Sequence, residues 1–418
     1  MRTFGRTRPG WLRLATGGLA LLLVMVAGGA PQATPALRGG GSWDALWLGQ
    51  PGTAGGTSLA DVRTIIGANT PTTASLDGSG VGIALIDTGV VPVPGLPSAQ
   101  VVNGPDLSFE SQASHLRYMD TYGHGTHMAG IIVGDDPATG VKGLAPKAKL
   151  TSIKVGAVNG AVDVSQVIAA IDWVVAHRND DPANPIRVIN LSYGSGGNPA
   201  FWTDPLQFAV EQAWHAGIVV VAAAGNDGNG HGKLNNPASN PYVIAVGAAL
   251  TKGTLTTNDD TLAPFTNLAN AGKQVDLLAP GESIVSLRNP GSNIDNHYPS
   301  ARVGDTLFRG SGTSQATAVT AAAAALLLQA RPWLVPDEVK WHLKEGATYL
   351  PTSPAGSMGL KELNLAGALS LNNGWHPQNW TRSDGTGLLE DARGNSHVVR
   401  NGVQLQGEAS IFGPWHSA

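Results

Sequence analysis

The chain has 418 residues, of which 42% are hydrophobic and 13% are charged, and its formal net charge is −4. This balance, with no Lys/Arg block beyond the extreme N-terminus, gives no indication of nucleic-acid binding. The absence of cysteine excludes disulfides, thiolate metal sites and a thiol nucleophile. The length suits one large α/β domain with extensions.

Residues 1–30 have the layout of a secretory signal peptide. Arginines among the first 13 residues precede the apolar run 19–26, and small residues follow up to Ala30. An uncleaved membrane anchor is the alternative, but the run is well short of the roughly 20 apolar residues of a spanning helix. We expect secretion, cleavage near Ala30 and no stable membrane anchor afterwards. Residues 31–58 should form a Gly/Pro-rich N-terminal segment.

The main domain is expected at residues 59–372. Ser58 is a suitable N-cap for a short helix over 59–66. Residues 81–86 are a continuous apolar run, typical of a strand buried on both faces of a parallel sheet. The run ends in Asp87, at the strand end where open α/β sheets build their sites. A turn-forming aspartate is the alternative.

A Gly-rich stretch around His124 precedes the next expected helix. His124 and His127 have a spacing that can bind metal, but no Glu lies between them as in HExxH and the chain has no cysteine. The pattern therefore favours His124 as a base.

From residue 149 to 247 the chain alternates between expected strands and expected helices. Strands are expected at 149–155, 188–192, 218–224 and 242–247, and helices at 164–177 and 204–215. Such alternation predicts an α/β fold with a doubly wound, mainly parallel sheet and helices on both faces. Asn226, just after the third of these strands, is either a turn residue or an amide donor at the sheet edge.

A Gly/Ser turn places Ser314 at the start of a strongly apolar helix that ends before Pro332. Backbone N–H groups and the positive helix end point outward there, so negative charge is well tolerated. A helix-capping serine is the simpler alternative.

Residues 336–343 should form another helix, and 363–371 the closing segment of the domain. Residues 373–418 contain Trp375, Trp380 and Trp415, and we expect a β-like or poorly ordered tail.

Asp87, His124 and Ser314 thus lie at the ends or starts of strands and helices that should meet at one sheet edge. Their order along the chain, Asp, His, Ser, is one of the orders in which catalytic triads for nucleophilic catalysis occur. Serine needs an adjacent base, and that base needs a buried carboxylate to set its tautomer. The Asn226 amide and the Ser314 N–H would supply the donors for an oxyanion.

Four motifs in this order resemble those of the subtilisin-like serine peptidases, the subtilases: 86–90, 123–130, 223–226 and 312–314. The resemblance extends from about Leu76 to Leu371. It implies a subtilisin-like fold and a secreted serine endopeptidase that forms an acyl-enzyme on Ser314. His124 would be the general base and then the general acid, Asp87 would orient it, and Asn226 would stabilise the oxyanion.

The resemblance also implies polypeptide substrates and a binding cleft with two walls. The wall that pairs with the substrate backbone would be Ser192, Tyr193 and Gly194, and the opposite wall Ala223, Ala224 and Gly225. The chemistry requires no cofactor. A structural calcium ion would be compatible with the loops of Asp135, Asp136 and Asp181, to which we assign no ligand roles. We expect a monomer.

The chain departs from the family at Gln315, where a methionine usually follows the serine, and residues 31–58 are too few for the propeptide domain of many relatives. A catalytically inactive binding or scaffold protein of the same fold is the alternative function. An ester hydrolase of another α/β class is disfavoured, because Ser314 lacks the Gly-x-Ser-x-Gly elbow and the residue order differs.

Overall fold

The structure is a computed structural model that describes residues 56–196, 201–350, 359–372, 374, 376–400 and 403–415. The predicted signal peptide, and all of the N-terminal segment before residue 56, lie outside the described residues. Within the ranges described, none of the helices has the length and apolar character that crossing a bilayer requires.

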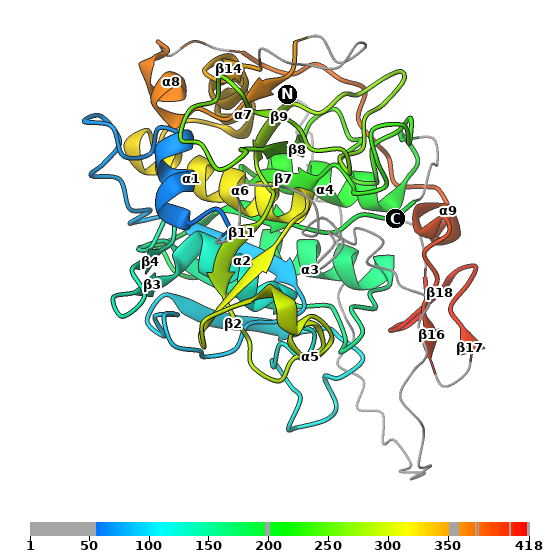
Figure 1. The fold of residues 1–418 in the computed structure, drawn as a ribbon. Coiled ribbons are helices and arrows are strands. Elements are labelled where there is room, and N and C mark those ends of the chain that lie inside the picture. Colours follow the sequence, from blue (N-terminus) through cyan, green and yellow to red (C-terminus); the bar gives the residue numbers. More distant parts are fainter. Residues whose placement is uncertain are drawn as a thin grey trace.

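A large sheet forms the centre of the molecule (Figure 1). Its strands lie in the order β14-β15-β10-β8-β7-β6-β1-β5-β2, and β9 pairs with β8. Every pairing from β15 to β2 is parallel, whereas β14–β15 and β8–β9 are antiparallel. The strands are β1 Gly82–Asp87, β2 Val101–Asp106, β5 Lys149–Lys154, β6 Ile186–Leu191, β7 Val219–Ala223, β8 Ile244–Leu250, β9 Thr261–Leu262, β10 Leu277–Pro280, β14 Thr348–Tyr349 and β15 Lys361–Glu362.

Helices cover both faces of this sheet. In Figure 1, α2 and α6 lie in front of the sheet and α3 and α4 behind it. Helix α6 packs against α2 and crosses β6, β7 and β8, while α3 and α4 pack against each other. The longer helices are α1 Leu59–Ile65, α2 His124–Val133, α3 Val164–His177, α4 Pro205–His215, α6 Thr313–Ala330, α7 Pro336–Glu345 and α8 Leu365–Ser370. The predicted α/β fold with a doubly wound, mainly parallel sheet is therefore confirmed.

Local sequence signals explain where several helices begin. Ser58 caps α1 in a capping box with Asp61, as the N-cap prediction required. Asp163 caps α3 together with Gln166, and Asp204 caps α4 ahead of a proline at the first helical position. These caps fix the helix starts within one residue of the predicted positions.

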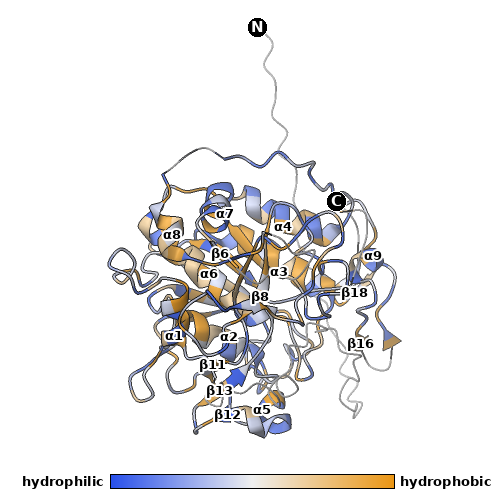
Figure 2. Ribbon diagram, turned by 45° about the horizontal axis from the view of Figure 1, so that its top comes forward, coloured by the Kyte–Doolittle hydropathy of each residue, from blue (hydrophilic) through white to orange (hydrophobic). Residues whose placement is uncertain are grey.

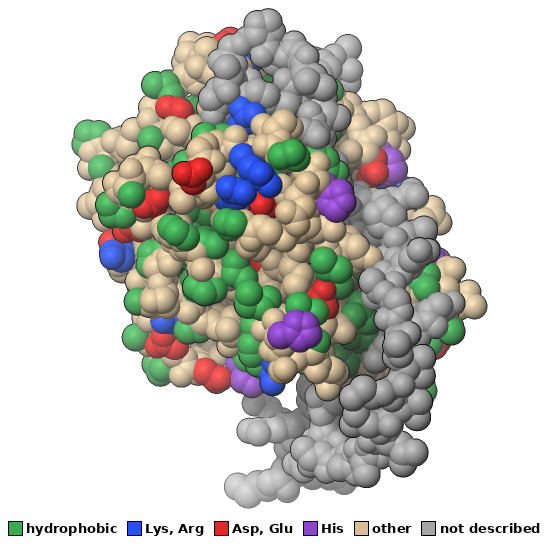
Figure 3. Space-filling model, turned by 60° about the horizontal axis from the view of Figure 1, so that its bottom comes forward, with side chains coloured by type: hydrophobic (Ala, Val, Ile, Leu, Met, Phe, Trp, Pro, Cys, Tyr) green, Lys and Arg blue, Asp and Glu red, His purple; other side chains and the backbone are tan. Residues whose placement is uncertain are grey.

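The core consists mainly of the apolar side chains of the central strands and of α6 (Figure 2). All of β1 and β7 is buried, as the continuous apolar runs predicted. Helix α6 is buried from Thr313 to Leu328, so its N-terminus is held firmly in place. On the face that Figure 3 shows, side chains of both charges are interspersed with apolar ones.

Smaller elements complete the fold. An antiparallel sheet of β11 Ile284–Leu287, β13 Leu307–Gly310 and β12 Arg302–Val303 leads directly into α6. The others are β3 Asp135–Asp136, β4 Val141–Lys142, α5 Asn293–His297 and the 3-10 turn Pro299–Ala301.

The C-terminal region contains short strands, as predicted, and also a helix that the sequence did not predict. Two hairpins, β16–β17 and β18–β19, follow helix α9. Their bounds are α9 Leu389–Arg393, β16 Val399–Arg400, β17 Val403–Gln404, β18 Ala409–Ser410 and β19 Gly413–Pro414. Trp415 packs against the main core. The described part of this region is therefore an integral layer of the fold.

Candidate active site

Asp87 and His124 form a buried pair at the carboxyl edge of the sheet. Asp87 is the last residue of β1 and His124 the first of α2. His124 Nδ1 lies 2.8 Å from Asp87 Oδ1 and 2.9 Å from Oδ2, and the two residues are only 8% and 6% exposed. Because an ionised carboxylate only accepts, Nδ1 is the donor. The neutral ring therefore carries its lone pair on Nε2.

A glycine and a second carboxylate hold the start of α2. Gly123 has φ 105°, in the left-handed region, and a Cβ there would clash with Ser292 Oγ. Asp120 Oδ1 accepts from the Gly123 N–H at 2.7 Å, and its Oδ2 accepts from the Thr126 N–H at 2.8 Å. Sequence reasoning missed Asp120, although an acid just before a helix start is a capping signal.

Thr88 joins the two carboxylates. Its hydroxyl donates to Asp120 Oδ1 at 2.7 Å, and its N–H donates to Asp87 Oδ1 at 2.7 Å. The same hydroxyl accepts from the Gly125 N–H at 2.9 Å. The position of the His124 ring is thus fixed through the strand end and the helix start together. Thr88 was not singled out from the sequence either.

The electrostatic surroundings distinguish the two histidines. Burial disfavours the imidazolium of His124, but the charge and hydrogen bond of Asp87, with the charge of Asp120, outweigh it and raise its pKa. Burial, and next the charge of His124, lower the pKa of His127 to about 3. Of these two, only His124 is therefore suited to exchange a proton near neutral pH.

Ser314 is the second residue of α6, and the predicted oxyanion donor lies beside it. Asn226, three residues after β7, accepts the Thr313 N–H on its Oδ1 at 2.8 Å. The amide oxygen is thus the acceptor for Thr313, and the NH₂ group of the same amide is the part of Asn226 that can donate. Gly225 adopts φ 114° and donates its N–H to Thr313 Oγ1 at 3.3 Å, which couples the loop after β7 to the helix start.

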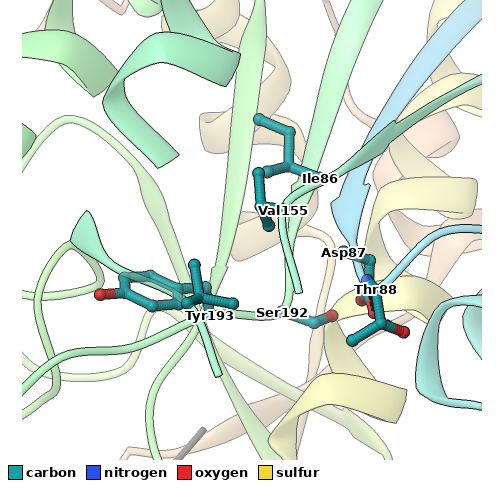
Figure 4. A pocket seen from close by; sticks show the side chains of 7 residues that line it. Ile86, Asp87, Thr88, Val155, Ser192 and Tyr193 are labelled. Carbon is teal, nitrogen blue, oxygen red and sulfur yellow. Dashed lines mark hydrogen bonds between the residues drawn. The ribbon is translucent and has the colours of Figure 1, made fainter. Parts of the chain in front are cut away.

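Ser192 connects the two halves of the site. Its hydroxyl donates to the Ser314 carbonyl at 3.3 Å. It also lines a small pocket with Asp87, Thr88 and Tyr193, in which the Ser192 side chain points toward Asp87 and Thr88 (Figure 4). The Tyr193 ring points the other way.

The predicted second wall begins at Ala223, the last residue of β7, and continues to Gly225 at the same sheet edge. Ala224 donates its N–H to Val246 O at 2.9 Å, and its carbonyl accepts from the Asn235 N–H at 3.0 Å. Because these backbone groups are occupied, Ala224 can border a cleft but cannot pair with a peptide backbone.

The predicted calcium loops contain carboxylates engaged by their own turns. Asp136 accepts from the Ala138 N–H at 3.0 Å, and Asp181 accepts from the Ala183 N–H at 3.0 Å. Among the residues that the structure describes, no group of three or more His, Asp or Glu side chains could hold a metal ion.

Comparisons with known proteins identify the family of this chain. A sequence model of the subtilase family matches residues 78–387, and the chain belongs to that family. Serine protease AprX of Bacillus subtilis is 39% identical over 65% of this chain and 62% of its own length. Subtilisin Savinase of Lederbergia lenta is 33% identical over 70% of this chain and 92% of its own. This chain spans about a third of minor extracellular protease Epr of Bacillus subtilis, to which it is 35% identical over 62% of this chain.

The fold matches a solved structure as well. A crystal structure of a cold-adapted subtilisin-like serine proteinase superposes with a TM-score of 0.54 at 29% identity, over 72% of this chain and 92% of that one. The resemblance inferred from the four motifs is therefore confirmed, and the family match extends beyond the predicted domain end at residue 372.

Proposed function

We propose that this protein is a secreted serine endopeptidase that hydrolyses polypeptides through an acyl-enzyme on Ser314. The observation that carries the proposal is the buried Asp87–His124 hydrogen bond at the sheet edge where α6 begins. Family membership and relatives described as serine proteases support the reaction class. The signal-peptide pattern of residues 1–30 supports secretion.

In the proposed first step, Ser314 Oγ attacks the scissile carbonyl carbon while His124 Nε2 takes the hydroxyl proton. Asp87 keeps the proton on Nδ1 and stabilises the imidazolium that forms. Negative charge develops on the carbonyl oxygen, beside the N-terminus of α6. The Ser314 N–H and the Asn226 Nδ2 would donate to that oxygen.

The tetrahedral intermediate then collapses. The C–N bond breaks, and His124 gives its proton to the leaving amine, which departs as the new N-terminus. Water then attacks the acyl-enzyme ester while His124 takes its proton. The bond from the acyl carbon to Ser314 Oγ breaks, His124 returns the proton to Ser314 Oγ, and the free acid leaves. No metal or organic cofactor takes part in this proposed sequence. A monomer suffices because all four proposed groups come from one chain.

A fluorophosphonate probe tests the proposal, because it labels only a serine activated as a nucleophile. Wild-type protein should be labelled on Ser314, and Ser314→Ala should not, while both keep the same circular dichroism spectrum. A folded wild type that resists labelling would instead support the inactive scaffold alternative. Casein tested beside simple esters separates peptidase from esterase, and N-terminal sequencing of the secreted protein locates the cleavage near Ala30.

A further inference from the structure

The C-terminal segment, defined as residues 376–400 and 403–415, is attached to the flank of the domain beside α3 and α4 (Figure 1). The Ser383 N–H donates to Glu211 Oε2 on α4 at 2.8 Å. Leu389 and Ala392 of α9 are fully buried in the main core. The described part of the segment is thus fixed to the catalytic domain by polar and apolar contacts together.

One arginine fixes the inner side of this segment. Arg393 is 0% exposed, and its Nε donates to Asp163 Oδ2 at 2.6 Å. Asp163 is also fully buried and caps α3. The same guanidinium donates to the carbonyls of Gly407, at 2.5 Å, and Ala409. Arg393 therefore joins α9, the last hairpins and the start of α3 in one buried cluster.

This cluster adjoins the predicted substrate wall. Ser195 donates its hydroxyl to the Ala392 carbonyl at 2.6 Å. Tyr193 is only 3% exposed, and its ring, which lines the same pocket as Asp87, extends away from that carboxylate (Figure 4). Burial, and next the charge of Asp163, raise the pKa of the Tyr193 hydroxyl.

The stretch of this wall whose backbone could pair with a substrate also ends beside α9, at Ser195. The Ser195 N–H donates to Asn236 O at 2.9 Å, and its carbonyl accepts from the Asn236 N–H at 3.0 Å. An extended peptide could therefore add its main-chain hydrogen bonds only as far as Gly194. Ser192 marks the other end, because its hydroxyl contacts the Ser314 carbonyl.

This inference rests on the proposed endopeptidase activity. Given that activity, these contacts limit the number of substrate residues that the cleft can bind along this wall. An extended chain advances about 3.3 Å per residue, so roughly three residues lead from Ser192 to Ser195 and α9. We propose that the C-terminal segment closes the substrate cleft where the fourth residue before the scissile bond would lie. Arg393 is the specificity-determining residue that holds it there. Substrates are therefore extended polypeptides recognised through about three residues on that side of the bond.

A length series of chromogenic peptides tests this with the full chain. The peptides share the three residues before the scissile bond and carry zero, one or two further residues, with leucine as the fourth. For wild type we expect kcat/KM to stay level beyond three residues. For Arg393→Ala we expect a rise of about tenfold or more on adding the fourth residue, the gain that a newly opened apolar subsite gives.

Ser195→Ala and Arg187→Ala complete the design. Ser195→Ala removes one hydrogen bond to Ala392 and no charge, so it tests the contact if Arg393→Ala fails to fold, with an expected rise of about threefold. Arg187→Ala is the matched control, because its guanidinium donates to the Pro332 and Leu334 carbonyls at the far end of β6. It should keep the wild-type length profile.

Each outcome decides between the two proposals. A wild type that already gains from the fourth residue, or folded variants whose length profiles match wild type, would overturn this inference alone. A folded wild type that neither labels with the fluorophosphonate nor cleaves any peptide overturns the proposed function, and this inference with it.

Discussion

The N-termini of α2 and α6 face the same sheet edge but are satisfied in opposite ways. At α2, the Asp120 carboxylate accepts the Gly123 and Thr126 N–H groups. At α6, the N-cap residue Gly312 makes no side-chain cap hydrogen bond, and the Thr313 N–H donates to the neutral Asn226 amide. The Asp120 carboxylate, whose pKa burial raises, thus compensates the positive end of α2. The acceptor at α6 is neutral, so the positive end of α6 could stabilise the negative charge that develops in the proposed mechanism.

The difference in charge at the two helix N-termini indicates two different roles. The α2 terminus is built for position, because its network holds the His124 ring against Asp87 in one tautomer. In the proposed mechanism the α6 terminus stabilises a transient anion, and a carboxylate there would repel that oxyanion. Variants that exchange charged and neutral groups at these two helix starts should therefore have different effects on activity.

The largest effect is expected from Asp87→Asn. The amide can donate to His124 Nδ1 and so move the ring proton to Nε2, where it blocks abstraction of the serine proton. We expect kcat to fall about 10⁴-fold, the loss found for the same change in a serine peptidase of another fold. Peptide hydrolysis at pH 8 measures it. Asp181→Asn, in an exposed turn, is the control and should retain full activity, and a loss below about 100-fold in Asp87→Asn would contradict the assigned role.

Asn226→Ala should have the next largest effect. It removes the neutral donor from the α6 terminus, and kcat should fall about 10²–10³-fold with little change in KM, as for loss of one such donor in a subtilisin. Steady-state kinetics on one peptide separate the two constants. Asn258→Ala, at an exposed position, is the control. A rise in KM with unchanged kcat would show that Asn226 binds the ground state instead.

The elements and site residues that could be predicted from the sequence are those marked by a pattern of consecutive residues. Continuous apolar runs predicted β1 and β7, because strands buried on both faces need apolar side chains at every position. The edge strand β2 was not predicted: it contains Asn, Gly and Pro, and its burial is partial. The positions of Asp87, His124, Asn226 and Ser314 followed from motifs that each occupy a few consecutive residues.

The groups that sequence reasoning missed act through contacts between distant segments. Arg393 lies 230 residues from its partner Asp163, within a five-residue helix too short for a periodic pattern. The link between Thr88 and Asp120 spans 32 residues and depends on the turn that leads into α2. Such contacts become visible only when the sheet has placed its strand ends side by side.

The last and smallest effect tests the α2 side of the comparison. Asp120→Asn keeps the shape of the side chain, but its NH₂ group cannot accept one of the backbone N–H groups that now share the carboxylate. It also removes one of the negative charges that raise the pKa of His124. We expect kcat to fall about tenfold through a displaced His124 ring, because small misplacements of a reacting group are costly.

The pH dependence distinguishes this role from a merely structural one. The proposed mechanism requires neutral His124, so the acidic limb of kcat/KM should follow its pKa. Removing the Asp120 charge lowers that pKa, and the limb should therefore move to lower pH in Asp120→Asn. Asp106→Asn is the matched control, because Asp106 also accepts backbone N–H groups, from Ser108 and Tyr118, without being among the charges that act on His124. A limb that stays in place, or moves to higher pH, would mean that Asp120 holds the helix start without tuning the base.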